Sequence, residues 1–178
     1  PYDRIVHKLL RAEEDNSKLF YVAYRNSDDL TTATMRFFLG TQLQCAKCHD
    51  HPYEDWKQKD YYGMAGFFVR TFVVEADGET EHVKKFYVGE KSTGNVNFKA
   101  TPKDAKPGTK GEPVKPRFLS GPELQEPELP KDFKEPKVEQ KKAPVKPLFS
   151  RREKVVEWIT AKDNPYLARA AVNRIWAQ

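Results

Sequence analysis

Proline is concentrated in one stretch of this chain, and that concentration limits what the chain can fold into. Ten of the 13 prolines lie between residues 102 and 147, among many lysines and glutamates. Proline fixes its own φ angle and lacks a backbone N–H, so it interrupts helix interiors and central strands. Residues 101–147 are therefore predicted to be an extended Pro/Lys-rich linker, with one island at 117–122 that can dock on a core.

Helical patterns lie on both sides of this stretch. Apolar residues recur at a period of about 3.6 residues over four segments, residues 2–14, 28–48, 60–69 and 151–177. Ser27 is expected to cap the second helix and Asp60 the third, while Pro165 is expected in the first turn of a restarted helix near the end. Each apolar face is too wide to leave exposed, so the two ends of the chain are predicted to pack together.

Three short β-prone runs, 71–74, 83–88 and 95–98, follow the third helix and are separated by glycines. They predict a small antiparallel β meander. The expected fold class is mainly α with this meander (α+β) and the long linker. Residues 1–100 are expected to form one domain, and residues 148–178 the helical start of a second, truncated domain that packs on the first.

Composition and motifs argue against several classes of function. The net charge is +5, but the lysines are spread thinly, without the dense basic runs and interleaved aromatics of a nucleic-acid surface. No run of about 18 apolar residues predicts a membrane span. No Ser/His/Asp arrangement, phosphate loop or spaced carboxylate pair indicates an enzyme class. Because the chain begins at Pro1 and ends inside a helical pattern, we expect it to be a fragment whose partner is the rest of the same polypeptide.

Both cysteines of the chain lie in residues 45–52, here called the Cys/His segment. Cys45, Cys48 and His49 would occupy positions i, i+3 and i+4 of a helix and so share one face. A c-type haem needs this pattern, since two thiols form thioethers with the porphyrin vinyl groups and the adjacent imidazole becomes an axial iron ligand. Met64 follows the motif and is the candidate for the second axial ligand.

Two other interpretations remain open for the same residues. Cys45 and Cys48 with His49 or His51 can bind zinc, although a fourth ligand is not evident and the chain has only His7 and His82 as further histidines. The cysteines can instead form a local disulfide or be small side chains at a helix end. Pro52 disfavours helical geometry at His51, so the two neighbouring histidines are expected to have different roles, His49 as the iron ligand of a haem or His51 as the likelier zinc ligand.

The residues around the motif resemble a known family. Residues 38–52 (FLGTQLQCAKCHDHP), Trp56 and residues 62–68 (YGMAGFF) are similar to the signature of a planctomycete-type domain of unknown function that is commonly joined to cytochrome c domains. Residues 163–177 (DNPYLARAAVNRIWA) resemble the opening of a second planctomycete-specific domain of unknown function that usually follows it.

The resemblance implies an exported, periplasmic-type setting near redox or polysaccharide-processing systems. It favours a haem c or metal-binding module of a redox or electron-transfer protein, with a cytochrome c domain of the same polypeptide and a redox partner as its partners. The alternative is a non-catalytic structural or interaction module, in which the Cys/His segment is a zinc or disulfide staple.

Overall fold

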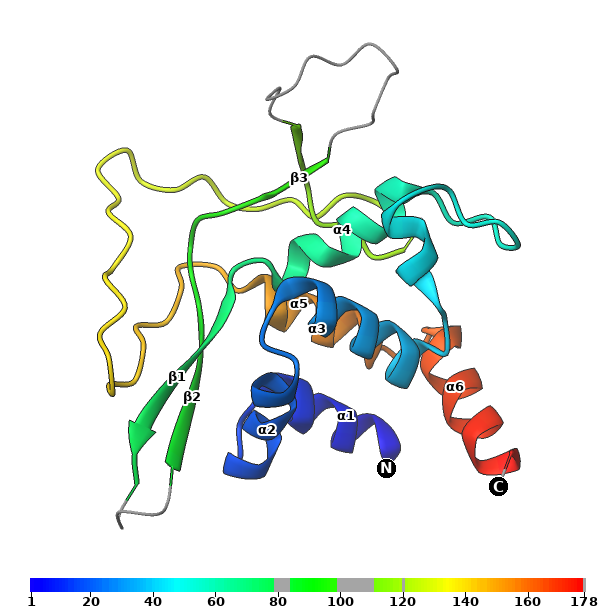
Figure 1. The fold of residues 1–178 in the computed structure, drawn as a ribbon, viewed down its shortest axis with the longest axis horizontal. Coiled ribbons are helices and arrows are strands. Elements are labelled where there is room, and N and C mark those ends of the chain that lie inside the picture. The colour runs from blue at the N-terminus through cyan, green and yellow to red at the C-terminus, as the bar shows by residue number, and fades with distance from the viewer. Residues whose placement is uncertain (79–83, 99–110, 120, 178) are drawn as a thin grey trace.

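The computed structural model describes residues 1–78, 84–98, 111–119 and 121–177 (Figure 1). Its α-helices are α1 (Tyr2–Arg11), α2 (Asp15–Ala23), α3 (Ser27–Thr34), α4 (Gln58–Phe68), α5 (Arg151–Ile159) and α6 (Pro165–Trp176). Between α3 and α4 lie a π-helical turn, η1 (Met35–Leu39), and a 3₁₀-helix, η2 (Leu43–Lys47). The strands are β1 (Thr71–Asp77), β2 (Lys84–Glu90), β3 (Val96–Phe98) and β4 (Glu112–Val114). The predicted α+β class is confirmed.

The strands form two separate antiparallel pairs. β1 pairs with β2 in a long hairpin that projects from the helices (Figure 1), and β3 pairs with β4. The predicted third strand therefore leaves the hairpin and joins the proline-rich stretch. Part of the reason is packing on α4, because the Phe98 ring lies 5.0 Å from the ring of Tyr62. Val83, the first residue of the expected run 83–88, lies outside the described residues. So does the start of the predicted linker, residues 101–110.

The single helix predicted over residues 28–48 is wrong, because the helix ends at Gly40. Gly40 has a left-handed backbone with φ of 65°, a conformation that glycine adopts without steric cost. It is also crowded, since a Cβ at this position would lie 3.2 Å from the Cβ of Ala170 on α6. The chain then turns and starts again as η2, so the Cys/His segment is not the end of a long helix.

Two helix caps differ from the prediction, and the position of Pro165 agrees with it. Asn26, not Ser27, caps α3, since its side chain accepts a hydrogen bond of 2.8 Å from the Asp29 amide. Asp60 is not the residue before α4 but lies in its first turn, where it accepts from the Lys57 amide at 2.8 Å. Asn164 caps α6 and Pro165 is in its first turn, as predicted.

The core is shared by both ends of the chain. Val155, Val156 and Ile159 of α5 are fully buried, and α5 packs against α1 and α4. In Figure 1, α5 runs through the middle of the molecule behind α3. No helix in the part of the chain that the structure describes is long and apolar enough to cross a membrane.

The described part of the proline-rich stretch is extended, but it is attached to the core at several points. Leu119 and Leu124 are buried, which confirms that the island near residue 117 docks. Arg117 forms an ion pair with Asp60 of α4. Its amide donates to the Gly63 carbonyl at 3.0 Å. A chain of proline-rich composition is thus held in place by a few apolar and charged contacts.

Arg70, Glu126 and Arg151, here called the Arg151 cluster, form a further attachment. Arg151 is only 1% exposed. Its Nε donates to Glu126 Oε1 at 2.8 Å, and its Nη1 donates to the Gly66 carbonyl at 3.0 Å. Arg70 Nη1 donates to the same Glu126 oxygen at 2.9 Å. Burial alone would raise the pKa of Glu126, but the two guanidinium groups hold it below its ordinary value.

Candidate functional site

The Cys/His segment begins inside η2, whose two sides differ in burial. Leu43 and Ala46 are buried and anchor the turn, while Cys45 and Cys48 are exposed and free. A 3₁₀-helix has about three residues per turn, so residues three positions apart lie on the same side. Cys45 lies in η2 and Cys48 directly follows it, so both thiols are on the exposed side of the turn, although the helix type differs from the one expected.

Side chains from two neighbouring helices hold this turn in place. Lys47 Nζ donates to Asp28 Oδ2 at 2.6 Å, and Tyr61 Oη donates to Asp28 Oδ1 at 2.9 Å. Tyr62 Oη donates to the Lys47 carbonyl at 3.1 Å. Burial alone would raise the pKa of Asp28, but the hydrogen bonds from Lys47 and Tyr61 lower it. An ionised Asp28 therefore ties α3, η2 and α4 together next to the two thiols.

His49 is held by one backbone hydrogen bond. Its Nδ1 lies 2.7 Å from the carbonyl oxygen of Asp50. A carbonyl oxygen can only accept, so Nδ1 carries the hydrogen and the lone pair of the neutral ring is on Nε2. Histidines that bind metals almost always donate their second ring nitrogen to a carbonyl or carboxylate in this way. His49 thus has the tautomer that a metal or haem-iron ligand needs, and it is exposed.

His51 has the opposite tautomer. Its Nδ1 lies 3.2 Å from the Tyr53 amide nitrogen and 3.0 Å from that of Glu54, and both amides donate to it. Nδ1 is therefore the acceptor, and the hydrogen of the neutral ring is on Nε2. The His51 amide also donates to the Trp56 carbonyl at 2.8 Å. His51 closes the loop that leads to α4, and in this state neither ring nitrogen is free to bind a metal.

Met64 is in a different environment from the thiols. Its side chain is 0% exposed, and its sulfur accepts a hydrogen bond of 3.4 Å from the Leu119 amide. The structure therefore turns the Met64 sulfur into the core and does not bring it to the exposed face of η2. His7 lies on α1 and is partly buried, and His82 lies outside the described residues.

Among the residues that the structure describes, no group of three or more His, Cys, Asp or Glu side chains is arranged to hold a metal ion. Beside the motif, however, a cavity of about 300 Å³ has Cys45 on its wall, together with Arg36 and Thr41. Thr41 Oγ1 is buried and has no hydrogen-bond partner among the described residues. Sequence analysis missed these neighbours because Arg36 and Thr41 lie on opposite sides of the break at Gly40.

Comparison with protein families gives a match for the first part of the chain, residues 1–72. No curated protein and no solved structure matches this chain. Residues 163–177 lie outside the matched region, so their resemblance to a second family stays a prediction. The match spans α1 to α4, η1, η2 and the whole Cys/His segment. Over residues 1–72, the chain is similar to the family described as PSCyt2, a protein of unknown function (DUF1549).

Proposed function

We propose that Cys45, Cys48 and His49 form the cofactor site of an exported redox or electron-transfer protein, and that the cofactor is haem c. The observation that carries the proposal is the state of the three side chains. Two free, exposed thiols lie on one side of a 3₁₀ turn. The next residue, His49, donates Nδ1–H to the Asp50 carbonyl and so keeps its Nε2 lone pair free.

These residues fit the chemistry of haem c attachment. The Cys45 and Cys48 sulfurs would hold the porphyrin through thioethers, and His49 Nε2 would be the axial ligand. When bound, the haem supplies a one-electron redox centre. The Asp50 carbonyl keeps the His49 ring in one tautomer and orientation. The contacts of Lys47 with Asp28 and Tyr62 keep the turn fixed to α3 and α4 before any cofactor arrives.

The proposal assigns no second axial ligand from this chain. Met64 was the candidate by sequence, but its sulfur is buried and engaged with the Leu119 amide. A ligand from a redox partner or from the rest of the polypeptide would complete the iron site. The exported setting is part of the proposal and rests on the sequence resemblance of the motif region.

The test is expression with and without haem c maturation machinery, followed by the pyridine haemochrome spectrum and the mass of the intact chain. We expect covalent haem in the matured wild type and none in the Cys45→Ser, Cys48→Ser double variant. His49→Ala should keep the covalent attachment but lose the absorption spectrum of histidine-ligated iron. His51→Ala is the matched control, two residues away, and should largely keep that spectrum.

A zinc staple is the competing function, and the free, exposed thiols suit it as well. With His51 as the zinc ligand, its ring must release the Tyr53 and Glu54 amides, because Nδ1 carries the hydrogen when the Nε2 lone pair binds the metal. Protein purified after maturation with no covalent haem overturns the haem proposal. Stoichiometric zinc that is lost in His51→Ala, measured by elemental analysis, would establish the staple instead.

A further inference from the structure

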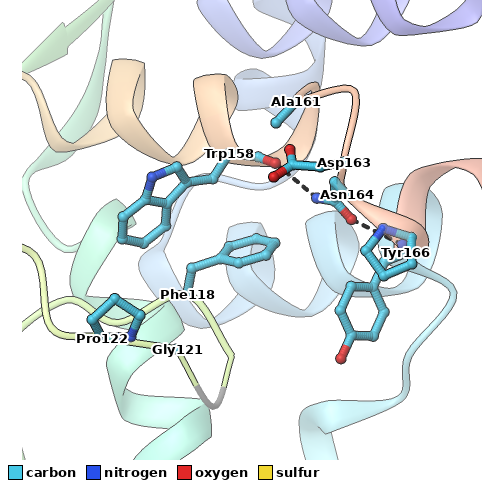
Figure 2. A pocket seen from close by; sticks show the side chains of 9 residues that line it. Phe118, Gly121, Pro122, Trp158, Ala161, Asp163, Asn164 and Tyr166 are labelled. Atoms are coloured by element: carbon cyan, nitrogen blue, oxygen red, sulfur yellow. Dashed lines mark hydrogen bonds between the residues drawn. The ribbon is translucent and has the colours of Figure 1, made fainter.

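An aromatic pocket of about 340 Å³ lies where α5 ends and α6 begins (Figure 2). The side chains of Phe118, Trp158 and Tyr166 line it, with the ring of Pro122 at one edge. Figure 2 shows the Phe118 ring between the other two aromatic side chains. No residue of the Cys/His segment contributes to this pocket, so the proposed haem function does not account for it.

The aromatic walls are held rigidly. The ring centroids of Phe118 and Trp158 are 5.6 Å apart with an interplanar angle of 69°. On its other side, Trp158 packs against the fully buried Phe67, with 5.5 Å between the centroids. Edge-to-face packing of this kind fixes side chains in one orientation. A ligand would therefore meet preformed aromatic surfaces and would not have to order them.

The amide side chain on the pocket wall is already hydrogen-bonded. Asn164 Nδ2 donates to the Trp158 carbonyl at 2.7 Å, and its Oδ1 accepts from the Tyr166 amide at 2.8 Å. The exposed lining of the pocket is mostly apolar. The pocket therefore suits a ligand whose body is largely apolar.

Asp163 is the only charged side chain among the lining residues, and it is exposed. Helix α5 also ends here, and the C-terminal end of a helix carries partial negative charge. Asn164 caps the start of α6 and so occupies a backbone amide at the opposite, positive helix end. The charge around the pocket is therefore complementary to a cation.

We propose that this pocket binds an organic cation of the quaternary or methylated ammonium class. The aromatic rings attract such a cation through their quadrupoles, and its apolar methyl groups pack against them. Asp163 supplies the counter-charge at the rim. The inference is independent of the proposed haem site, because the two share no residue.

The test uses choline and 3,3-dimethylbutan-1-ol (dimethylbutanol below). The second is a neutral molecule of the same shape, in which carbon replaces the charged nitrogen. Isothermal titration should show choline binding about five-fold or more tightly than dimethylbutanol, the ratio that roughly 1 kcal/mol of cation–π attraction gives. Among the three indole N–H signals in the NMR spectrum, choline should shift that of Trp158, assigned with Trp158→Phe.

Asp163→Asn should weaken choline binding several-fold, and Asp132→Asn is the matched control. Both residues are exposed aspartates, but Asp132 does not line the pocket. Equal binding of choline and its neutral counterpart, or equal effects of the two substitutions, overturns the proposal. So does the absence of choline binding by a folded wild-type protein.

Discussion

The Arg151 cluster and the Cys/His segment are both polar, yet their hydrogen bonds differ in reach and in exposure. Arg151 is buried, and its guanidinium joins Glu126 and Gly66, which lie 25 and 85 residues away in sequence. The imidazole rings of the two histidines in the Cys/His segment are hydrogen-bonded within three residues of themselves, at the surface. In the Arg151 cluster, every strong donor joins distant segments. In the Cys/His segment, two thiols and one imidazole nitrogen remain available.

This difference follows from the cost of burying charge. A buried guanidinium without hydrogen-bond partners is strongly unfavourable, so the fold needs each of its partners in its observed position. An exposed thiol or imidazole is solvated, so it can be left unused until a ligand arrives. We therefore expect the two regions to respond in opposite ways to substitution, one through stability and the other through cofactor binding.

Removing the buried cation should have the largest effect. Arg151→Met leaves Glu126 with Arg70 alone and leaves Gly66 and Asn95 without their donor. Breaking a buried ion pair from one side costs about 3 to 5 kcal/mol, and we expect a loss of that size in the free energy of unfolding from urea denaturation. Arg169→Met, an exposed arginine on α6, is the control. A loss no greater than that of the control would show that the cluster does not hold the fold together.

Glu126→Gln should have a smaller effect, about 2 to 3 kcal/mol at neutral pH, because an amide still accepts hydrogen bonds but loses the charge. The pKa of Glu126 is lowered from its ordinary value of 4.5 in the folded state. Its ionised form therefore stabilises the fold above that value, and the stabilisation is lost as the pH falls through the lowered pKa. The difference between variant and wild type should narrow in acid.

The variant and the wild type must be compared with each other at each pH, because the buried carboxyl of Glu90 acts in the opposite direction. Burial raises the pKa of Glu90, so its contribution favours acid and is lost as the pH rises. Glu128→Gln, an exposed neighbour in the same stretch, controls for the loss of one charge. A difference for Glu126→Gln that stays constant from neutral to acid pH would contradict the ion-pair explanation.

The smallest effect on stability is expected on the outer side of η2. In the cofactor-free protein, Cys45→Ser with Cys48→Ser should change the free energy of unfolding by less than about 0.5 kcal/mol. Leu43→Ala, on the buried side of the same turn, should cost about 2 to 5 kcal/mol. Chemical denaturation of both variants gives the comparison. A large loss for the cysteine variant would mean that the thiols are structural, as the staple interpretation requires.

Periodicity and capping residues were sufficient for much of the fold. The restart of α6 was predictable because its signal, Pro165 in the run from Asp163 to Pro165, lies at the start of the helix itself. The break at Gly40 was not, because an isolated glycine in a helical pattern is usually tolerated. What decides it is the approach of Ala170, which is distant in sequence and invisible to local patterns.

The candidate site likewise has features that the sequence could predict and features that it could not. The spacing of Cys45, Cys48 and His49 predicted these candidate groups without knowledge of the fold. The support from Asp28 and Tyr61 depends on how α3, η2 and α4 meet, and no spacing rule reports that contact. Glu126 was hidden for another reason. Composition describes the average residue of the proline-rich stretch, whereas individual side chains such as the partly buried Glu126 attach it to the core.

The late position of α5 in the chain has a consequence for biosynthesis. Residues 1–72 include Leu10 and Phe67, which are fully buried in the finished protein, yet α5, which packs against α1 and α4, begins only at Arg151. At translation rates of about 5–20 residues per second, the nascent chain waits roughly 4 to 16 seconds for that helix. During this interval the growing polypeptide presents an incomplete apolar core, and α1 and α4 cannot complete their packing until α5 has left the ribosome.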